Sequence, residues 1–119
     1  MLPKQTLLAC LVLVLLVSLV SLYLFSLDRV LNGIHYANFI SITVEHERES
    51  SGKWPTKLPD VETIARAHPG DLYYARMLRT HRASHPTLVI KHVDSHHFKA
   101  EIHYAWLFGE TEKINRSVP

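Results

Sequence analysis

The sequence is poor in the residues that build disulfides and phosphate-binding loops. It has one cysteine and four glycines among 119 residues. The cysteine, Cys10, lies inside an apolar run, so the rest of the chain forms no disulfide of its own, and an oxidising compartment is neither supported nor excluded. No P-loop, G-x-G-x-x-G or G-x-S-x-G pattern occurs, which argues against a nucleotide-binding loop and a hydrolase nucleophile elbow. Neither an internal repeat nor a low-complexity tract is present.

An excess of charge of one sign is also lacking. Apart from Lys4, which precedes the apolar run, the chain has twelve Lys and Arg against eleven Asp and Glu. A nucleic-acid-binding protein carries a concentrated basic face, so we expect no nucleic acid among the partners. The nine histidines add positive charge only below about pH 6.5.

One long hydrophobic run is present. Residues 7–25, LLACLVLVLLVSLVSLYLF, contain no charge and no proline. As a helix they would extend about 28 Å, close to the thickness of the hydrocarbon core of a bilayer. We predict a single transmembrane anchor that contacts membrane lipid. Lys4 before the run, and the nearly cancelling Asp28 and Arg29 after it, place the N-terminus in the cytoplasm and the C-terminal domain outside.

Two other interpretations compete with a permanent anchor: a cleaved secretory signal and a lipoprotein signal that ends at Cys10. Only about five residues separate Lys4 from Cys10, fewer than the apolar region of about 7–15 residues that such a signal needs. Cleavage after Ser18, Ser21 or Ser26 would put a leucine at the earlier of the two positions that require small residues. We therefore favour an uncleaved anchor.

An amphipathic helix is predicted over residues 26–50. Apolar and small side chains recur there at three- and four-residue steps without a proline: Leu27, Val30, Leu31, Ile34, Ala37, Ser41 and Val44. Gly33 weakens this helix, and the β-branched run FISITV, residues 39–44, leaves a strand as the competing interpretation. Glu45 and Arg48 stand one turn apart and are suited to pair.

The stretch ESSGKWPTKLPD, residues 49–60, is expected to end the helix. Gly52 suits a positive φ just past the last turn, and Pro55 disfavours helix at Trp54. We expect Trp54 to fold back onto a helix or sheet face as part of the core. Pro59 then opens a short helix through Ala65, which HPG at residues 68–70 ends.

Residues 71–84, DLYYARMLRTHRAS, fit either a helix capped by Asp71 or an alternating strand, and we favour a helix at their start. The segment gathers basic and aromatic side chains: Tyr73, Tyr74, Arg76, Arg79, His81 and Arg82. An amphipathic element with one wet face explains them better than a site for anionic lipid or an acidic partner.

The last third of the chain predicts a β-hairpin. TLVIKHV (87–93) and FKAEIHYAWLF (98–108) flank the polar turn DSHH. In the second run, alternation puts five apolar side chains on one face: Phe98, Ala100, Ile102, Tyr104 and Trp106. The tail, residues 110–119, is polar, and we expect it to fray.

These elements predict an α+β fold, in which an N-terminal transmembrane helix continues into an amphipathic helix and is followed by a small antiparallel β-sheet head. The expected parts are a short N-terminal segment (1–6), a transmembrane anchor (7–25), an amphipathic stalk helix (26–50), a small α+β head (51–109) and a polar tail (110–119).

The strongest candidate for metal ligands is HVDSHH, residues 92–97, because imidazole and carboxylate groups suit zinc or copper. A tetrahedral site needs side chains that converge from separate elements, whereas His92, Asp94, His96 and His97 share one turn. HERES, residues 46–50, lacks the second histidine of a zinc-protease helix. We therefore predict no metal, no cofactor and no catalytic residue.

The layout resembles that of type IV pilins and of the pseudopilins of type II secretion. Their turn G-x-[YW]-P is matched by Gly52-Lys53-Trp54-Pro55, with Leu58 and Val61 beginning the next segment. The resemblance implies a bacterial inner-membrane protein with a helical stalk and a small sheet. No glycine precedes the apolar run, and residues 5–12, QTLLACLV, contain no glutamate. The resemblance therefore extends to the architecture and does not imply prepilin processing.

The function expected from these observations is that of a non-enzymatic accessory or assembly subunit. It would contact a protein partner or a second copy through the transmembrane and stalk helix. The residues expected to matter most are structural: Trp54, Pro55, Tyr104 and Trp106. The alternative is a membrane-anchored binding domain that senses metal or pH through its histidines, at positions 81, 85, 92, 96, 97 and 103.

Overall fold

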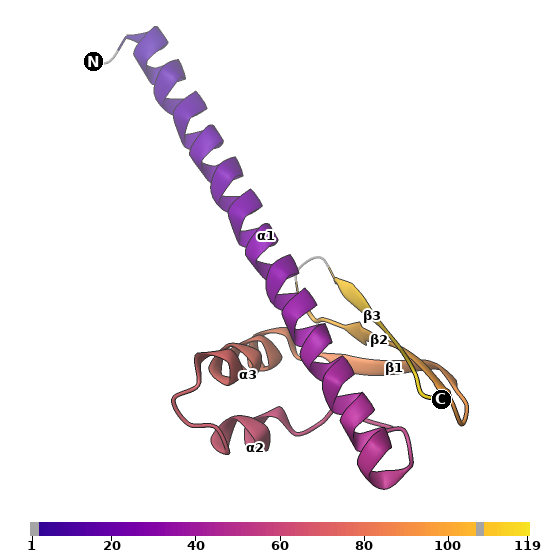
Figure 1. The fold of residues 1–119 in the computed structure, drawn as a ribbon. Coiled ribbons are helices and arrows are strands. Elements are labelled where there is room, and N and C mark those ends of the chain that lie inside the picture. The colour runs from indigo at the N-terminus through magenta and orange to yellow at the C-terminus, as the bar shows by residue number, and fades with distance from the viewer. Residues whose placement is uncertain (1–2, 107–108) are drawn as a thin grey trace. The chain divides into compact units, whose positions relative to one another are not determined.

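The computed structural model describes residues 3–106 and 109–119 (Figure 1). Its elements are α1 (Lys4–Ser51), α2 (Val61–Arg66), α3 (Leu72–Ser84), β1 (Thr87–Val93), β2 (His97–His103) and β3 (Thr111–Ser117). The chain divides into two compact units, Met1–Leu31 and Asn32–Pro119. The predicted α+β class is confirmed, because a long N-terminal helix precedes two short helices and an antiparallel sheet.

The second unit is built on a three-stranded antiparallel sheet in the order β1-β2-β3. The central strand β2 turns Phe98, Ala100 and Ile102 inward, and each is at most 2% exposed. Ala100 stands opposite Ile90 of β1 and Ile114 of β3, so the inward face continues across all three strands. The predicted alternation of β2 is therefore confirmed for these residues.

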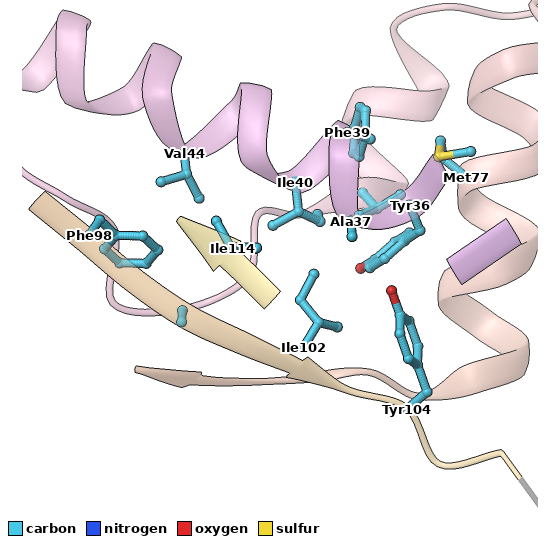
Figure 2. Close-up of a cluster of buried hydrophobic side chains, with 12 residues drawn as sticks. Tyr36, Ala37, Phe39, Ile40, Val44, Met77, Phe98, Ile102, Tyr104 and Ile114 are labelled. Carbon is cyan, nitrogen blue, oxygen red and sulfur yellow. The ribbon is translucent and has the colours of Figure 1, made fainter. Parts of the chain in front are cut away.

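The C-terminal half of α1 supplies the other side of this core. Tyr36, Ile40 and Val44, spaced one turn apart, are at most 1% exposed. Figure 2 shows these α1 side chains pointing toward the inward side chains of the sheet. Burial of three side chains of this size contributes about 5–9 kcal/mol of transfer free energy. This packing stabilises α1 even where its sequence contains weak helix formers.

The helical interpretation of FISITV is confirmed, since residues 39–44 lie within α1. Phe39, Ile40 and Val44 are buried, and the hydroxyl of Thr43 donates to the carbonyl of Phe39 at 2.9 Å. Tertiary packing outweighs the β propensity of the run. The predicted stripe is shifted, however: Ile34 is 40% exposed, while Tyr36 and Ile40 take the inward positions.

The ends of the helices follow the predicted chemistry. α1 stops at Ser51, and Gly52 adopts a φ of 77° while its N–H donates to the carbonyl of Arg48 at 3.0 Å. Asp60 caps α2 by accepting from the N–H of Thr63, so the short helix begins at Val61 and not at Pro59. The ambiguous segment 71–84 is helical, and Asp71 caps α3 as predicted.

The second strand of the hairpin ends earlier than expected. β1 has the predicted bounds, but β2 ends at His103, so the strand predicted over 98–108 is wrong for residues 104–106. Tyr104 N–H still donates to Glu110 in the register of β2 and β3, but Ala105 N–H donates to Ser84 at the end of α3, so the ladder does not continue through residue 105. Residues 107 and 108 of that predicted strand lie outside the described residues.

The expectation of a frayed tail is wrong, because residues 111–117 form β3. The strand pairs with β2 over its whole length, from Thr111 opposite His103 to Ser117 opposite His97. Only Ile114 is buried, at 2% exposed. Backbone pairing and one anchored side chain thus hold a strand whose composition is otherwise polar. Whether the predicted parts of the chain act as separate domains stays a prediction.

Candidate functional site

The apolar run occupies the N-terminal part of α1. This helix is long and apolar enough to cross a membrane, and none of its most apolar stretch is buried in the structure. Its leucine and valine side chains are exposed on every side, as the values for Leu7, Leu11 and Val14 illustrate at 57–61%. So large an apolar surface is unfavourable in water and is matched by a lipid environment. Cys10 is exposed within this run.

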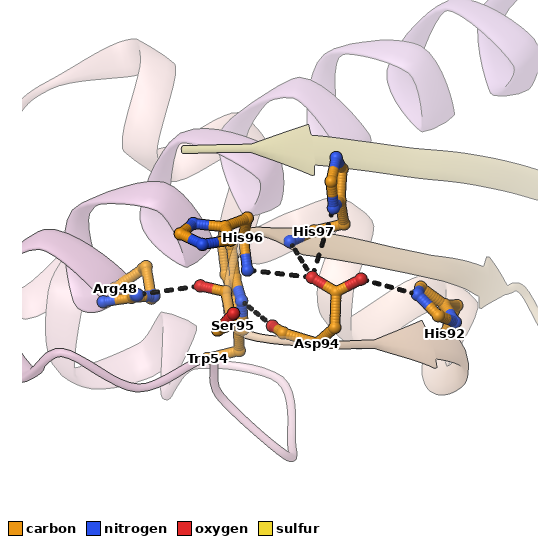
Figure 3. Close-up of polar contacts among 7 residues, drawn as sticks. All are labelled: Arg48, Trp54, His92, Asp94, Ser95, His96 and His97. Carbon is orange, nitrogen blue, oxygen red and sulfur yellow. Dashed lines mark hydrogen bonds and ion pairs between the residues drawn. The ribbon is translucent and has the colours of Figure 1, made fainter. Parts of the chain in front are cut away.

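Trp54 joins the end of α1 to the sheet. Its ring stacks on Phe98 of β2, with centroids 5.4 Å apart and an interplanar angle of 26°. The indole N–H donates to the carbonyl of Asp94 at 2.9 Å, and the Arg48 guanidinium lies 5.6 Å from the ring (Figure 3). The prediction that Trp54 packs onto a sheet face is therefore confirmed. The neighbouring Pro55 is buried.

Arg48, in the last turns of α1, also contacts the β1–β2 turn. Its guanidinium donates to the carbonyl of Ser95 at 2.9 Å. The suggested pairing of Arg48 with Glu45 is wrong, since Glu45 forms an ion pair with Arg116 of β3 at 3.3 Å. A pair within one helix is worth only about 0.3–0.5 kcal/mol, too little to keep these two side chains from partners on the β1–β2 turn and on β3.

The β1–β2 turn is organised by the Asp94 carboxylate. One oxygen, Oδ1, accepts from the backbone N–H groups of His96 and His97, at 2.8 and 2.7 Å, and contacts His97 Nδ1 at 3.1 Å. The other oxygen contacts His92 Nε2 at 2.9 Å (Figure 3). The hydrogen bond from His92, followed by those from the backbone, holds the pKa of Asp94 far below its usual range.

This geometry decides how the candidate metal ligands are used. His92, Asp94 and His97 do come together, but the carboxylate that would bind a cation already accepts four hydrogen bonds. A metal bound by His92, Asp94 and His97 together would need the two imidazole nitrogens that now contact the carboxylate, so those two contacts would have to break. Within residues 3–106 and 109–119, no group of three His, Cys, Asp or Glu side chains is arranged to hold a metal.

Tyr104 and Trp106 pack against α1 at Gly33, where the missing side chain leaves room for their rings. The two rings stack with centroids 4.8 Å apart, and the Tyr104 hydroxyl donates to the Gly33 carbonyl at 2.9 Å. A β-carbon at Gly33 would lie 3.5 Å from the Trp106 ring and 3.6 Å from the Tyr104 ring. The sequence analysis missed this role of Gly33, because it interpreted a glycine inside a helix only as destabilising.

A second missed contact joins α1 to α3. The Tyr36 hydroxyl and His81 Nδ1 lie 2.7 Å apart. Burial raises the pKa of Tyr36 and lowers the pKa of His81, so both groups are neutral where they meet. Glu62 and Asp60 act on His81 in the opposite direction, to a smaller extent. The sequence offered no signal for this pair, since its members are 45 residues apart.

The basic and aromatic segment lies on α3 as an amphipathic helix. Tyr74 and His81 are half-buried, and Tyr73 contacts Phe39 edge to face at 6.2 Å. Arg82 pairs with Glu62 of α2 at 3.1 Å. Arg76 and Arg79 are exposed. The prediction of an amphipathic helix with an exposed basic face is thus confirmed.

The sheet has two edges, β1 and β3, and no further strand among the described residues pairs with either. The inward-facing Ile90 and Val93 of β1 remain 37% and 47% exposed. A bulge between Ile90 and His92 interrupts the register near Lys91. An edge strand with partly exposed apolar side chains is a surface on which another chain can pair, and a bulge with a lysine limits that pairing.

A long N-terminal apolar helix followed by a small antiparallel sheet is a pilin-like layout. Comparison with family models, with curated proteins and with solved structures gives no significant match to the chain.

Proposed function

We propose that the chain is a non-enzymatic, single-pass membrane protein whose small extracytoplasmic head acts through protein contacts as an accessory or assembly subunit, in the manner of a pilin or pseudopilin. The observation that supports this most is the two-part use of α1. Its N-terminal part is apolar and exposed on every side, while its C-terminal part is buried in a folded head. One helix therefore serves both as anchor and as core.

The contacts of the head favour an assembly role over the alternative of metal sensing. The Asp94 carboxylate is engaged by donors of its own turn, and Trp54 and Arg48 both bind the backbone of that turn. These contacts support a structural role for the three residues, namely holding the turn in place. Two exposed surfaces suit a protein partner: the apolar run suits lateral helix packing, and the β1 edge suits strand addition.

Photo-crosslinking in native membranes tests this proposal. A photoreactive amino acid at Ile90, on the β1 edge, or at Val14, in the apolar run, should give discrete adducts with protein. The matched control is Lys99, which is exposed on the outward face of the central strand. Monomer alone from every position would contradict a role in assembly.

The proposed orientation has its own test. A single cysteine at Asn115, introduced with Cys10→Ala, should react with a membrane-impermeant maleimide added to intact cells, because Asn115 is exposed on β3. Labelling only after the cells are lysed would place the head in the cytoplasm and reverse the orientation.

A further inference from the structure

The outward face of α3 differs from the rest of the head in its charge. Six residues of this helix are exposed on the side away from the buried Met77 and Thr80: Leu72, Ala75, Arg76, Arg79, Arg82 and Ala83. We call them the α3 face. At about 100° per residue, they fall within a single arc of the helix. The α3 sequence, LYYARMLRTHRAS, contains no acidic residue, so this face is purely basic and apolar.

Two of its arginines are not neutralised. Arg82 pairs with Glu62, which also contacts Arg66 at 3.4 Å. Arg76 and Arg79 form no hydrogen bond, ion pair or ring contact with any residue that the structure describes. The carboxylate of the N-cap residue Asp71 accepts a hydrogen bond from the N–H of Tyr73 at 2.9 Å. Leu72, which begins the face, is 86% exposed, more than the leucine and valine side chains of the apolar run.

Within the head, α3 packs near the point where the second unit begins. α3 packs against α1 through Tyr36 and Phe39, which belong to the first turns of the unit that begins at Asn32. The β1–β2 turn instead contacts Arg48, near the C-terminal end of α1. The α3 face therefore belongs to the end of the head where the chain enters from the apolar run.

We propose that the α3 face binds the anionic headgroups of the membrane in which the apolar run is anchored. Guanidinium groups pair with lipid phosphates, their aliphatic stems lie along apolar surface, and an exposed leucine can enter the headgroup boundary. Each cation near an anionic surface strengthens attachment about fivefold. Such attraction is weak for a free protein, but the anchor holds the head at high effective concentration beside the bilayer.

The test uses the full chain in lipid nanodiscs with a fluorophore on Ala83→Cys, in a Cys10→Ala background. Acrylamide, a neutral quencher, reports the exposure of the label without responding to changes in protein charge. Replacing neutral phosphatidylcholine by a mixture with about 30% phosphatidylglycerol should lower the quenching constant about threefold, and salt at about 1 M, where the screening length is about 3 Å, should restore it.

The decisive comparison is between two double variants of equal charge. R76Q/R79Q should abolish the lipid-dependent protection of the label. K99Q/K113Q, which removes two exposed cations from the outward face of the sheet, should retain it. Matching thermal unfolding curves would establish that both variants are folded. A label equally accessible in both lipids, or protection lost equally in both variants, would overturn the proposal. The first outcome would point to an acidic protein surface instead.

Discussion

At the scale of single residues, Trp54 makes the clearest contribution, because one side chain provides both a ring stack and a hydrogen bond. We expect Trp54→Ala to lower the free energy of unfolding by about 2–4 kcal/mol, since it opens a cavity above Phe98. Trp54→Phe keeps a ring there and loses only the donor to Asp94, at a cost of about 1 kcal/mol. Denaturant unfolding in detergent micelles measures both values.

The control for Trp54 is Lys53→Ala, at an exposed neighbour in the same turn. It should change stability by less than about 0.5 kcal/mol. If Trp54→Ala were equally silent, the indole would have no part in joining α1 to the sheet.

At Gly33, we expect a small and a large substitution to change the stability of the head in opposite directions. A β-carbon there meets the Tyr104 and Trp106 rings at ordinary contact distances of 3.5–3.7 Å. Gly33→Ala should therefore fit, and its better helix propensity should raise stability by up to about 1 kcal/mol. Gly33→Leu should lower stability by about 1–3 kcal/mol, because it pushes the aromatic pair away. Thermal unfolding separates the two, and a destabilised alanine variant would contradict this packing.

His81 makes the stability of the head depend on pH. Burial lowers its pKa in the folded chain, while in the unfolded chain the pKa is about 6.5. The unfolded state therefore binds the proton more readily, and stability should fall as the pH drops below about 6.5. Melting temperatures between about pH 7.5 and pH 5.5 measure this slope.

The slope should flatten in His81→Gln and stay unchanged in His46→Gln, since His46 is exposed on α1. Equal slopes in wild type and in His81→Gln would show that the contact between His81 and Tyr36 does not carry the effect.

At the scale of elements, β3 is the part that the sequence did not predict. Residues 111–117 are polar at nearly every position, so neither alternation nor composition distinguishes them from a loose tail. The strand exists because β2 offers an unpaired edge and Ile114 completes the core between Ile102 and Val44 (Figure 2). That information lies in tertiary structure, whereas the helices have local caps and stops that the sequence displays.

Ile114 tests whether β3 belongs to the folded head. Ile114→Ala should lower the free energy of unfolding by about 2–4 kcal/mol, because the side chain is 2% exposed. Asn115→Ala, at the adjacent exposed position, should cost less than about 0.5 kcal/mol. Urea unfolding compares the two, and equal, small effects would mean that the tail is not held on the sheet.

The candidate site was predictable only in part. The turn around Trp54 was predictable because glycine and proline specify local backbone geometry, and the ring needs apolar burial. The engagement of Asp94 by His92 and His97 follows from the hairpin turn, which the sequence did indicate. Gly33, Tyr36 and His81 were missed because their partners are far away in the sequence.

At the scale of the whole molecule, we propose that the apolar part of α1 stays attached to the head as a permanent anchor. Both parts lie in one unbroken helix, Lys4–Ser51, and the head uses residues of that helix for its core. Removal of the run would leave the core residues in place but would release the head from the membrane. Attachment and processing can therefore be measured together.

The most direct measurement is the intact mass of the native protein recovered from membranes after extraction with alkaline carbonate. We predict that the protein stays in the membrane fraction and that its mass still includes residues 7–25, which means 13.7 kDa for the 119 residues. A head recovered in the soluble fraction, lighter by about 20–26 residues, the size of a secretory signal, would contradict the permanent anchor.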